Sequence, residues 1–494
     1  MDKNTIFSKV EWVADSSFCI VSDKDFNGQT FPHFVFIFDS AGHQKCEPVK
    51  VKTAFNIQSD YCFSLGTSMF FLDGGEQQEG AAYEFKIMDR VSHDGVDHDE
   101  HIRIFYISKS KENKKLNSES YSFKVYRGTD RKKAVLAYNN DYKDPYNEGF
   151  RYRILDAEGK LTDEDTLNLP YLDKACSITD VIYDDGSNKI FLLCNLYSVT
   201  GKDEKKFRNS FITEYDLANK TYREISKGIP EFSKNKAQHL CNENIIAFSG
   251  LNYSEATENG WTAPIVAVNK NTFDLITSAS LKLDPKMAAV LFGLGKYILP
   301  VNFVFENDST YTVAWMKFFT IYQMNEIDNG NGSAVAAATL LFGLTGALIT
   351  AAATSASSID YGDFEKMLWI SYSARDNSVI MDTANSILRL NKYHAHGYTM
   401  FLKNNSAFWL MNKATSVNNR LSTIYVSPVI NKSHACDSLL YNEIANGNLN
   451  IIYPGSLMTQ NRKNYFVGEF NPDFYFQPMR KVSESNAYFL LEIE

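Results

Sequence analysis

The sequence lacks the short motifs by which many enzyme classes are recognised. Its 494 residues contain no G-x-S-x-G, P-loop, Rossmann glycine set, H-E-x-x-H or C-x-x-C. No strong catalytic motif is therefore present. The paired carboxylates of a glycoside hydrolase have no fixed spacing, so their absence is not established by a motif search.

The sequence also has fewer basic than acidic residues, and its cysteines do not form a disulfide pattern. There are 50 Lys and Arg against 59 Asp and Glu, for a formal net charge of −9. This balance argues against nucleic acid, whose phosphates require a Lys/Arg surface, and against a polybasic membrane-surface mode. The seven cysteines are odd in number and scattered, which indicates buried free thiols in strands rather than a disulfide framework.

Two kinds of helical segment are missing from the sequence pattern. The first eighteen residues contain no apolar core typical of a signal peptide. We therefore expect either an intracellular protein or an exported one whose signal has been removed. No long amphipathic helix is apparent either, which favours an all-β chain.

What the sequence does contain is aromatic and alternating. Hydrophobic residues make up 44% and aromatic residues 14% of the chain, a composition that favours strands. Short alternating segments repeatedly end at an Asp or Asn, followed by a polar turn and another strand, as expected for β-hairpins. These turn residues are Asp39, Asp156, Asp216, Asn269, Asn391 and Asn471.

The intervals between these turns correspond to one or two units of roughly sixty residues. A repeated four-stranded unit of this kind predicts a single β-propeller domain over residues 1–494, with about seven blades and a range of six to eight. The pattern resembles the broad superfamily of kelch-like and WD-like repeat proteins. The kelch double glycine and the Trp-Asp dipeptide do not recur in the repeats, so the resemblance implies an architecture and no functional residues.

The alternation also predicts which strand residues are buried. They are Phe36, Phe38, Phe191, Leu193, Ile246, Phe248, Val266, Val268, Leu388 and Leu390.

One segment departs from the β pattern. Residues 329–359 form an uncharged, Ala/Gly-rich stretch between two predicted strands, Tyr311 to Met324 and Lys366 to Ser373, and so hang from a hairpin tip. Residues 334–353 are long enough to cross a bilayer as one helix. The small residues suit closely packed helices equally well.

Three interpretations of this insert remain open: small helices packed on the propeller or on another chain, a membrane-inserted segment, or a mobile segment. Its acidic flanks differ from the Lys/Arg ends typical of transmembrane helices. An exposed apolar helix needs a partner. The candidate contact residues are Leu340, Leu341, Phe342, Gly343, Leu344, Gly346, Leu348 and Ile349.

Several histidines and acidic residues are candidates for holding a divalent metal ion, which is the one cofactor that the sequence suggests. His93, His98 and His101 are interspersed with four carboxylates, a combination suited to zinc, and a polar charged loop explains the pattern equally. His394 and His396 would share one face of a strand.

Other pairs have weaker ligand patterns. The His-x-Cys pairs His239/Cys241 and His434/Cys436 share the alternate spacing. Asp23, Asp25 and Asn27 match the opening of a calcium loop, but its twelfth position is Phe34 instead of Glu. The turn Asp184 to Gly186 has a similar composition, and a plain polar turn explains both segments.

The sequence as a whole favours a non-enzymatic binding or scaffold protein. A propeller face would bind a protein partner or a second copy of the chain, and the insert would serve assembly or membrane contact through residues 334–353. Two alternatives remain: a glycan-acting hydrolase with carboxylates at the propeller mouth, and a membrane-inserting protein.

Overall fold

The fold was analysed in a computed structural model of the whole chain. The structure describes residues 5–13, 17–24, 32–39, 43–52, 62–76, 82–92, 97–98, 102–108, 121–140, 147–200, 204–233, 237–253, 260–284, 297–306, 309–320, 361–391, 398–414, 422–429, 437–439, 450–452, 458–460, 463–470 and 487–493.

The described strands form eight antiparallel sheets that follow one another along the chain. In most of them each strand pairs with the next, so that one sheet is completed before the next begins. Such consecutive four-stranded meanders are the blades of a β-propeller. The all-β propeller prediction is therefore confirmed, and the eight sheets lie at the upper end of the predicted six to eight.

The chain divides into two compact units, Thr5–Asp284 and a second unit that contains Pro285–Glu494. The expectation of a single domain over residues 1–494 stays a prediction.

The first unit contains five sheets. Sheet one has β1 (Thr5–Trp12), β2 (Ser17–Lys24), β3 (Pro32–Asp39) and β4 (Val49–Lys52); sheet two has β5 (Cys62–Leu65), β6 (Ser68–Glu76), β7 (Ala82–Ser92), β8 (Asp97–His98) and β9 (Ile102–Ser108). Sheet three has β10 (Tyr121–Arg127), β11 (Lys133–Asn140), β12 (Asn147–Asp156) and β13 (Asp165–Leu172). After the short 3₁₀ turn η3 (Asp173–Ala175), sheet four has β14 (Cys176–Asp184), β15 (Lys189–Thr200), β16 (Glu204–Asp216) and β17 (Thr221–Ile225). Sheet five has β18 (Gln238–Cys241), β19 (Ile245–Ser249), β20 (Asn252–Tyr253), β21 (Trp261–Asn269) and β22 (Leu275–Lys282).

The second unit contains three sheets. Sheet six has β23 (Tyr297–Glu306), β24 (Thr310–Thr320), β25 (Tyr361–Ser373) and β26 (Val379–Asn391). Sheet seven has β27 (Tyr398–Lys403), β28 (Ser406–Ala414), β29 (Ser422–Pro428) and β30 (Asp437–Leu439); sheet eight has β31 (Asn450–Ile452), β32 (Met458–Gln460), β33 (Lys463–Phe470) and β34 (Ala487–Ile493).

The Asp/Asn turn residues mark the third long strand in sheets one, three, four and five. Asp39, Asp156, Asp216 and Asn269 are the last residues of β3, β12, β16 and β21. Asn391 instead ends β26, the fourth strand of sheet six. The interval between Asn269 and Asn391, which corresponds to two repeat units, therefore contains no additional blade. It reflects residues 321–360, which connect the paired strands β24 and β25 and lie outside the described residues.

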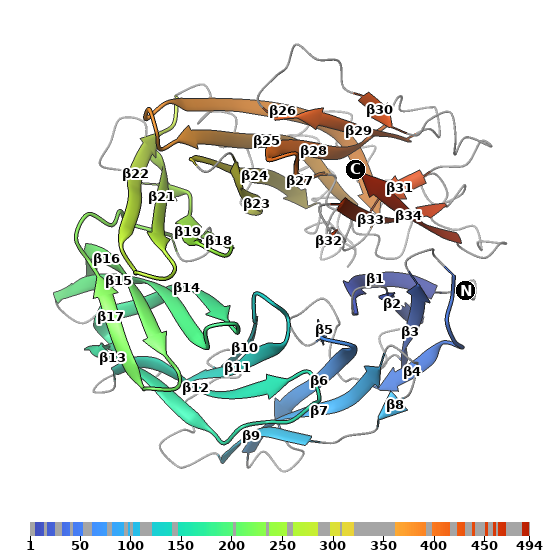
Figure 1. Cartoon of the computed structure of the whole chain (residues 1–494), viewed down its shortest axis with the longest axis horizontal. Coiled ribbons are helices and arrows are strands. Elements are labelled where there is room, and N and C mark those ends of the chain that lie inside the picture. The colour runs from blue at the N-terminus through green and yellow to red at the C-terminus, as the bar shows by residue number, and fades with distance from the viewer. Residues whose placement is uncertain are drawn as a thin grey trace, which may run out of the picture. The chain divides into compact units, whose positions relative to one another are not determined.

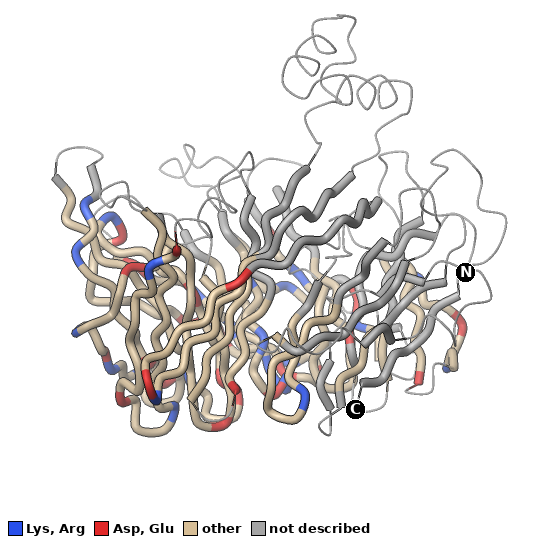
Figure 2. Tube along the Cα trace, turned by 90° about the horizontal axis from the view of Figure 1, so that it is seen from above, with Lys and Arg blue, Asp and Glu red and all other residues tan. Residues whose placement is uncertain are grey.

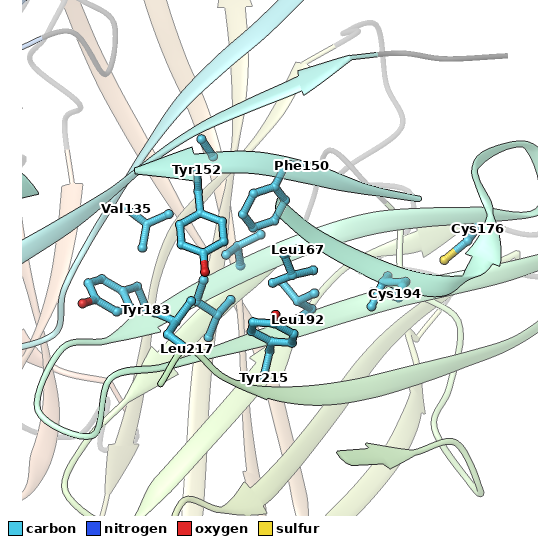
Figure 3. Close-up of a cluster of buried hydrophobic side chains, with 14 of the residues drawn as sticks. Val135, Phe150, Tyr152, Leu167, Cys176, Tyr183, Leu192, Cys194, Tyr215 and Leu217 are labelled. Carbon is cyan, nitrogen blue, oxygen red and sulfur yellow. The ribbon is translucent and has the colours of Figure 1, made fainter. Parts of the chain in front are cut away.

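The hydrophobic cores lie between neighbouring sheets. In the first unit one cluster joins sheets one and two, a second joins two and three, a third joins three and four, and a fourth joins four and five. Figure 3 shows the third cluster, where Phe150 and Tyr152 of β12 face Leu192 and Cys194 of β15. Each inner sheet is thus buried on both faces.

Burial on both faces explains why the strands read as nearly continuous apolar runs. Along β15, Ile190, Leu192 and Cys194 belong to the cluster shared with sheet three, whereas Phe191 and Leu193 belong to the cluster shared with sheet five. All five side chains are fully buried. Side chains that alternate across the strand serve two different interfaces.

The predicted core residues can be compared with these clusters. Seven of them are buried: Phe36, Phe191, Leu193, Ile246, Phe248, Val266 and Val268. Phe38 is partly buried and stacks on Phe18, with ring centroids 5.2 Å apart. Leu388 and Leu390 lie in β26, where their side chains are outside the described part of the chain.

The packing between sheets four and five yields a stability prediction. Leu193→Ala should lower the free energy of unfolding by about 2–4 kcal/mol, because it removes buried methyl groups and leaves a cavity. Leu275→Ala is the matched control, since Leu275 on β22 is 39% exposed. It should change stability by less than about 0.5 kcal/mol. Urea unfolding measures both variants, and equal losses would refute the assignment of Leu193 to the core.

Candidate functional site

The first strands of the sheets carry polar side chains that meet between blades. In the first unit these strands are β1, β5, β10, β14 and β18, and each pairs with only one neighbour, the second strand of its own sheet. Figure 1 shows them on the concave side of the unit, with the last strands β13, β17 and β22 on the convex side. Groups on the first strands are thus placed to approach each other across blades.

Four residues from three sheets form what we call the inner-strand cluster: Glu11, Ser64, Arg127 and Arg131. Glu11 on β1 is only 5% exposed. Nη1 of Arg127 on β10 donates to both of its carboxylate oxygens, at 3.0 and 2.7 Å, and Oγ of Ser64 on β5 donates to Oε2 at 3.1 Å. One buried carboxylate thereby connects sheets one, two and three.

The fourth member, Arg131, lies in the tight turn between β10 and β11. Its backbone has a φ of 55°, its N–H donates to the Gly128 carbonyl at 2.9 Å, and its carbonyl accepts the Gly66 N–H at 2.8 Å. Burial lowers the pKa of its guanidinium. The nearby Glu11 carboxylate raises this pKa and the Arg127 guanidinium lowers it, and the net shift is downward. The described residues offer this guanidinium no hydrogen-bond partner.

The turn that holds Arg131 is fixed against sheet four by Asp185. The carboxylate of Asp185 accepts backbone N–H groups of Asp130 and Lys132 at 2.8 Å and of Lys133 at 3.1 Å. Gly128 is required at this contact, because a Cβ there would lie 2.2 Å from Cγ of Asp185.

The neighbouring Asp184 connects sheets three, four and five. Its side chain is buried, with 1% exposed. Its carboxylate accepts hydrogen bonds from Oγ1 of Thr129 at 3.0 Å, from Nζ of Lys270 at 2.9 Å and from Oγ of Ser187. Burial alone would raise the pKa of Asp184, but these hydrogen bonds hold it below its ordinary value. The turn that resembled a calcium loop is thus a junction between blades.

A second pair of first-strand residues joins sheets four and five. Nδ1 of His239 on β18 lies 3.0 Å from Oδ2 of Asp180 on β14. Burial lowers the pKa of His239, but the Asp180 carboxylate more than offsets this, and the net shift is upward. His239 therefore has a carboxylate partner from another blade, which its spacing from Cys241 did not indicate.

The other residues singled out from the sequence fall mostly outside the described part of the chain. These are His93, His101, His394, His396, Asp25, Asn27, His434, Cys436 and the insert residues Leu340, Leu341, Phe342, Gly343, Leu344, Gly346, Leu348 and Ile349. Asp23 lies near the C-terminal end of β2, and His98 lies in β8. The side chains of both residues are outside the described part of the structure. Their metal-binding and contact roles stay predictions.

Within the described ranges, no group of three or more His, Cys, Asp or Glu side chains is arranged to hold a metal ion. The same ranges contain no helix that is both long and apolar enough to span a bilayer.

Comparison with known proteins finds no sequence relative and only distant structural likenesses. No protein-family model and no curated protein sequence matches the chain. The β-propeller domain of the Trilobed protease from Pyrococcus furiosus aligns at a TM-score of 0.36 with 10% identity, over 86% of this chain and 94% of that one. The WD40 domain of SCAP from fission yeast aligns at 0.25 with 10% identity, over 85% and 93%. Lignostilbene dioxygenase from Pseudomonas brassicacearum aligns at 0.33 with 9% identity, over 86% and 89%.

The β-propeller architecture of the chain is established by its own consecutive antiparallel sheets. Likenesses this distant transfer no activity to this protein, so its function has to be argued from its own residues.

The ion pair between Asp184 and Lys270 predicts a pH-dependent change in stability. Lys270→Met should lower the free energy of unfolding at pH 7 by about 1–3 kcal/mol, because it removes a hydrogen-bond donor from a buried carboxylate. A carboxyl group whose folded pKa is depressed stabilises the fold above its unfolded pKa of about 3.9, and this contribution is lost as the pH falls through the folded value. The difference between the two proteins should therefore narrow from pH 7 to pH 3.

Urea unfolding across this pH range measures the effect. Lys132→Met is the control, since Lys132 is exposed and its Nζ lies 3.9 Å from Asp130. A loss in Lys270→Met that is the same at every pH would mean that the Lys270 ammonium acts through packing and not through its charge.

The pair between Asp180 and His239 yields a separate prediction. Asp180→Asn should lower the pKa of His239, because the carboxylate that favours the imidazolium is gone. A raised histidine pKa stabilises the fold below the unfolded value of about 6.5 and ceases to do so as the pH rises through the folded value. The variant should therefore lose more stability at pH 5 than at pH 8.

NMR titration of the His239 ring, assigned with His239→Gln, measures this pKa. Asp163→Asn, which changes an exposed aspartate between β12 and β13, should leave it unchanged. An unaltered His239 pKa in Asp180→Asn would contradict the pairing.

Proposed function

We propose that this chain is a non-enzymatic binding protein. A partner protein docks on the turns around the inner-strand cluster of the first unit, and the uncharged insert at residues 329–359 makes a second contact, with another chain or with a membrane. The observation that carries the proposal is the use of the buried carboxylates. Glu11, Asp184 and Asp185 are each held by donors from other strands, and these bonds fix the blades relative to one another.

This use of carboxylates disfavours the hydrolase alternative. A general acid of a glycosidase needs a raised pKa and a second carboxylate close by. The hydrogen bond from Lys220 lowers the pKa of Asp165, and the hydrogen bonds from Ser187 and Lys270 lower that of Asp184 although its burial opposes this. Burial raises the pKa of Glu231. This residue lies between β17 and β18, however, and is not part of the inner-strand cluster.

The distribution of charge supports a binding surface at the turns. Figure 2 shows many Lys, Arg, Asp and Glu residues gathered at the tight turns that join the described strands. Turns held by a rigid sheet scaffold are favoured positions for recognition, because the sheets fix them while their side chains remain accessible.

The insert is attached in a way that allows its role to be tested. The ladder between β24 and β25 runs from Thr310 paired with Ser373 to Thr320 paired with Gly362. This pairing does not require residues 331–359, so a short Gly-Ser linker in their place should leave sheet six intact.

The test compares the full chain with this deletion variant. We expect the full chain to capture a protein from a lysate of its source, and the purified partner to bind again saturably at a fixed stoichiometry. The deletion variant should keep the circular dichroism spectrum of the full chain and lose self-assembly, membrane pelleting or part of the partner affinity. If neither form binds any partner saturably, and the chain instead releases sugar from a glycan panel, the hydrolase alternative replaces the proposal.

A further inference from the structure

One guanidinium at the inner-strand cluster takes no part in its hydrogen bonds. The Glu11 carboxylate accepts hydrogen bonds from Nη1 of Arg127 and from Oγ of Ser64. The guanidinium of Arg131, by contrast, has no hydrogen-bond partner among the described residues.

A partly buried, unpaired guanidinium is costly, because burial removes water from the charge. Its five N–H donors are arranged in a planar fork that matches the two oxygens of a carboxylate. The cost would be offset by a ligand that supplies one negative charge and two acceptor atoms. The Arg131 side chain therefore has N–H donors for which the described residues provide no acceptor.

The backbone beneath Arg131 is already fixed. It is bonded to Gly128 within its own turn and to Gly66 of sheet two, and the same turn is anchored to Asp185 of sheet four. Gly128 lies so close to Asp185 that the turn has no room to move toward sheet four. Little conformational freedom remains to be lost when a ligand binds, which favours affinity.

We propose that Arg131 is the anchor for a carboxylate on the partner, and that the partner presents an acidic protein segment to this turn. The proposal rests on the proposed binding function and names its chemistry. The planar fork of one guanidinium matches one carboxylate. A polyphosphate backbone requires a surface on which Lys and Arg dominate, whereas acidic residues outnumber basic ones in this chain, 59 to 50.

The test uses the full chain and a fluorescent, acetylated hexaglutamate peptide, with hexaglutamine as the uncharged match. Fluorescence anisotropy should show saturable binding of the glutamate peptide only. Arg131→Asn should weaken it by about tenfold or more, since a bidentate charged hydrogen bond is lost. Asparagine is chosen because it tolerates the left-handed backbone at this position. Arg131→Lys should give intermediate affinity, because it keeps the charge without the planar fork.

Lys132→Asn is the matched control, with the same new residue one position along in the same turn. It should bind the glutamate peptide within about twofold of the unaltered chain, as expected for an exposed lysine. Circular dichroism and thermal unfolding check that each variant is folded. If Arg131→Asn failed to fold, the comparison of Arg131→Lys with Lys132→Asn would still decide the question.

Equal binding by Arg131→Asn and the unaltered chain, or no binding by the unaltered chain, would overturn the assignment. Either result is distinguishable from failure of the proposed function. In that case the purified partner would still bind the full chain, and it would bind Arg131→Asn equally well.

Discussion

The first unit depends on the burial of both faces of its inner sheets against their neighbours. No single sheet of the first unit has a core of its own, because the four hydrophobic clusters all lie between successive sheets. A strand such as β15 divides its side chains between two interfaces. The stability of the first unit therefore depends on the interfaces between successive sheets as well as on the sheets themselves.

This packing leaves polar groups to the strand ends and turns, where they reinforce the same junctions. Asp184 and Asp185 hold turns of adjacent sheets, and Glu11 joins sheets that are not adjacent in the sequence. Three buried carboxylates of the first unit, those of Glu11, Asp184 and Asp185, are bonded in this way. The recognition role that we propose for Arg131 rests on a side chain that these junctions leave without a hydrogen-bond partner among the described residues.

Little of the candidate site was predictable from the sequence. Glu11 and Arg127 are 116 positions apart, and nothing in either local segment signals that they meet. Asp180 and His239 are 59 positions apart. Sequence patterns report local periodicity, whereas these contacts arise from the order in which sheets stack. The Asp184 to Gly186 turn was noticed for its composition, but its role as a junction follows from donors on three different sheets.

The sequence by itself determined the class of fold and much of the core. Period-2 alternation and Asp/Asn turns are local properties, and they predicted strands whose residues Phe191, Leu193, Ile246 and Phe248 are buried. The tertiary structure alone decided the number of sheets and the strand that Asn391 ends. A long connection inside sheet six and an additional blade would produce the same spacing between turns in the sequence. The tertiary structure also decided which charges pair, since pairing depends on side chains brought together from separate blades.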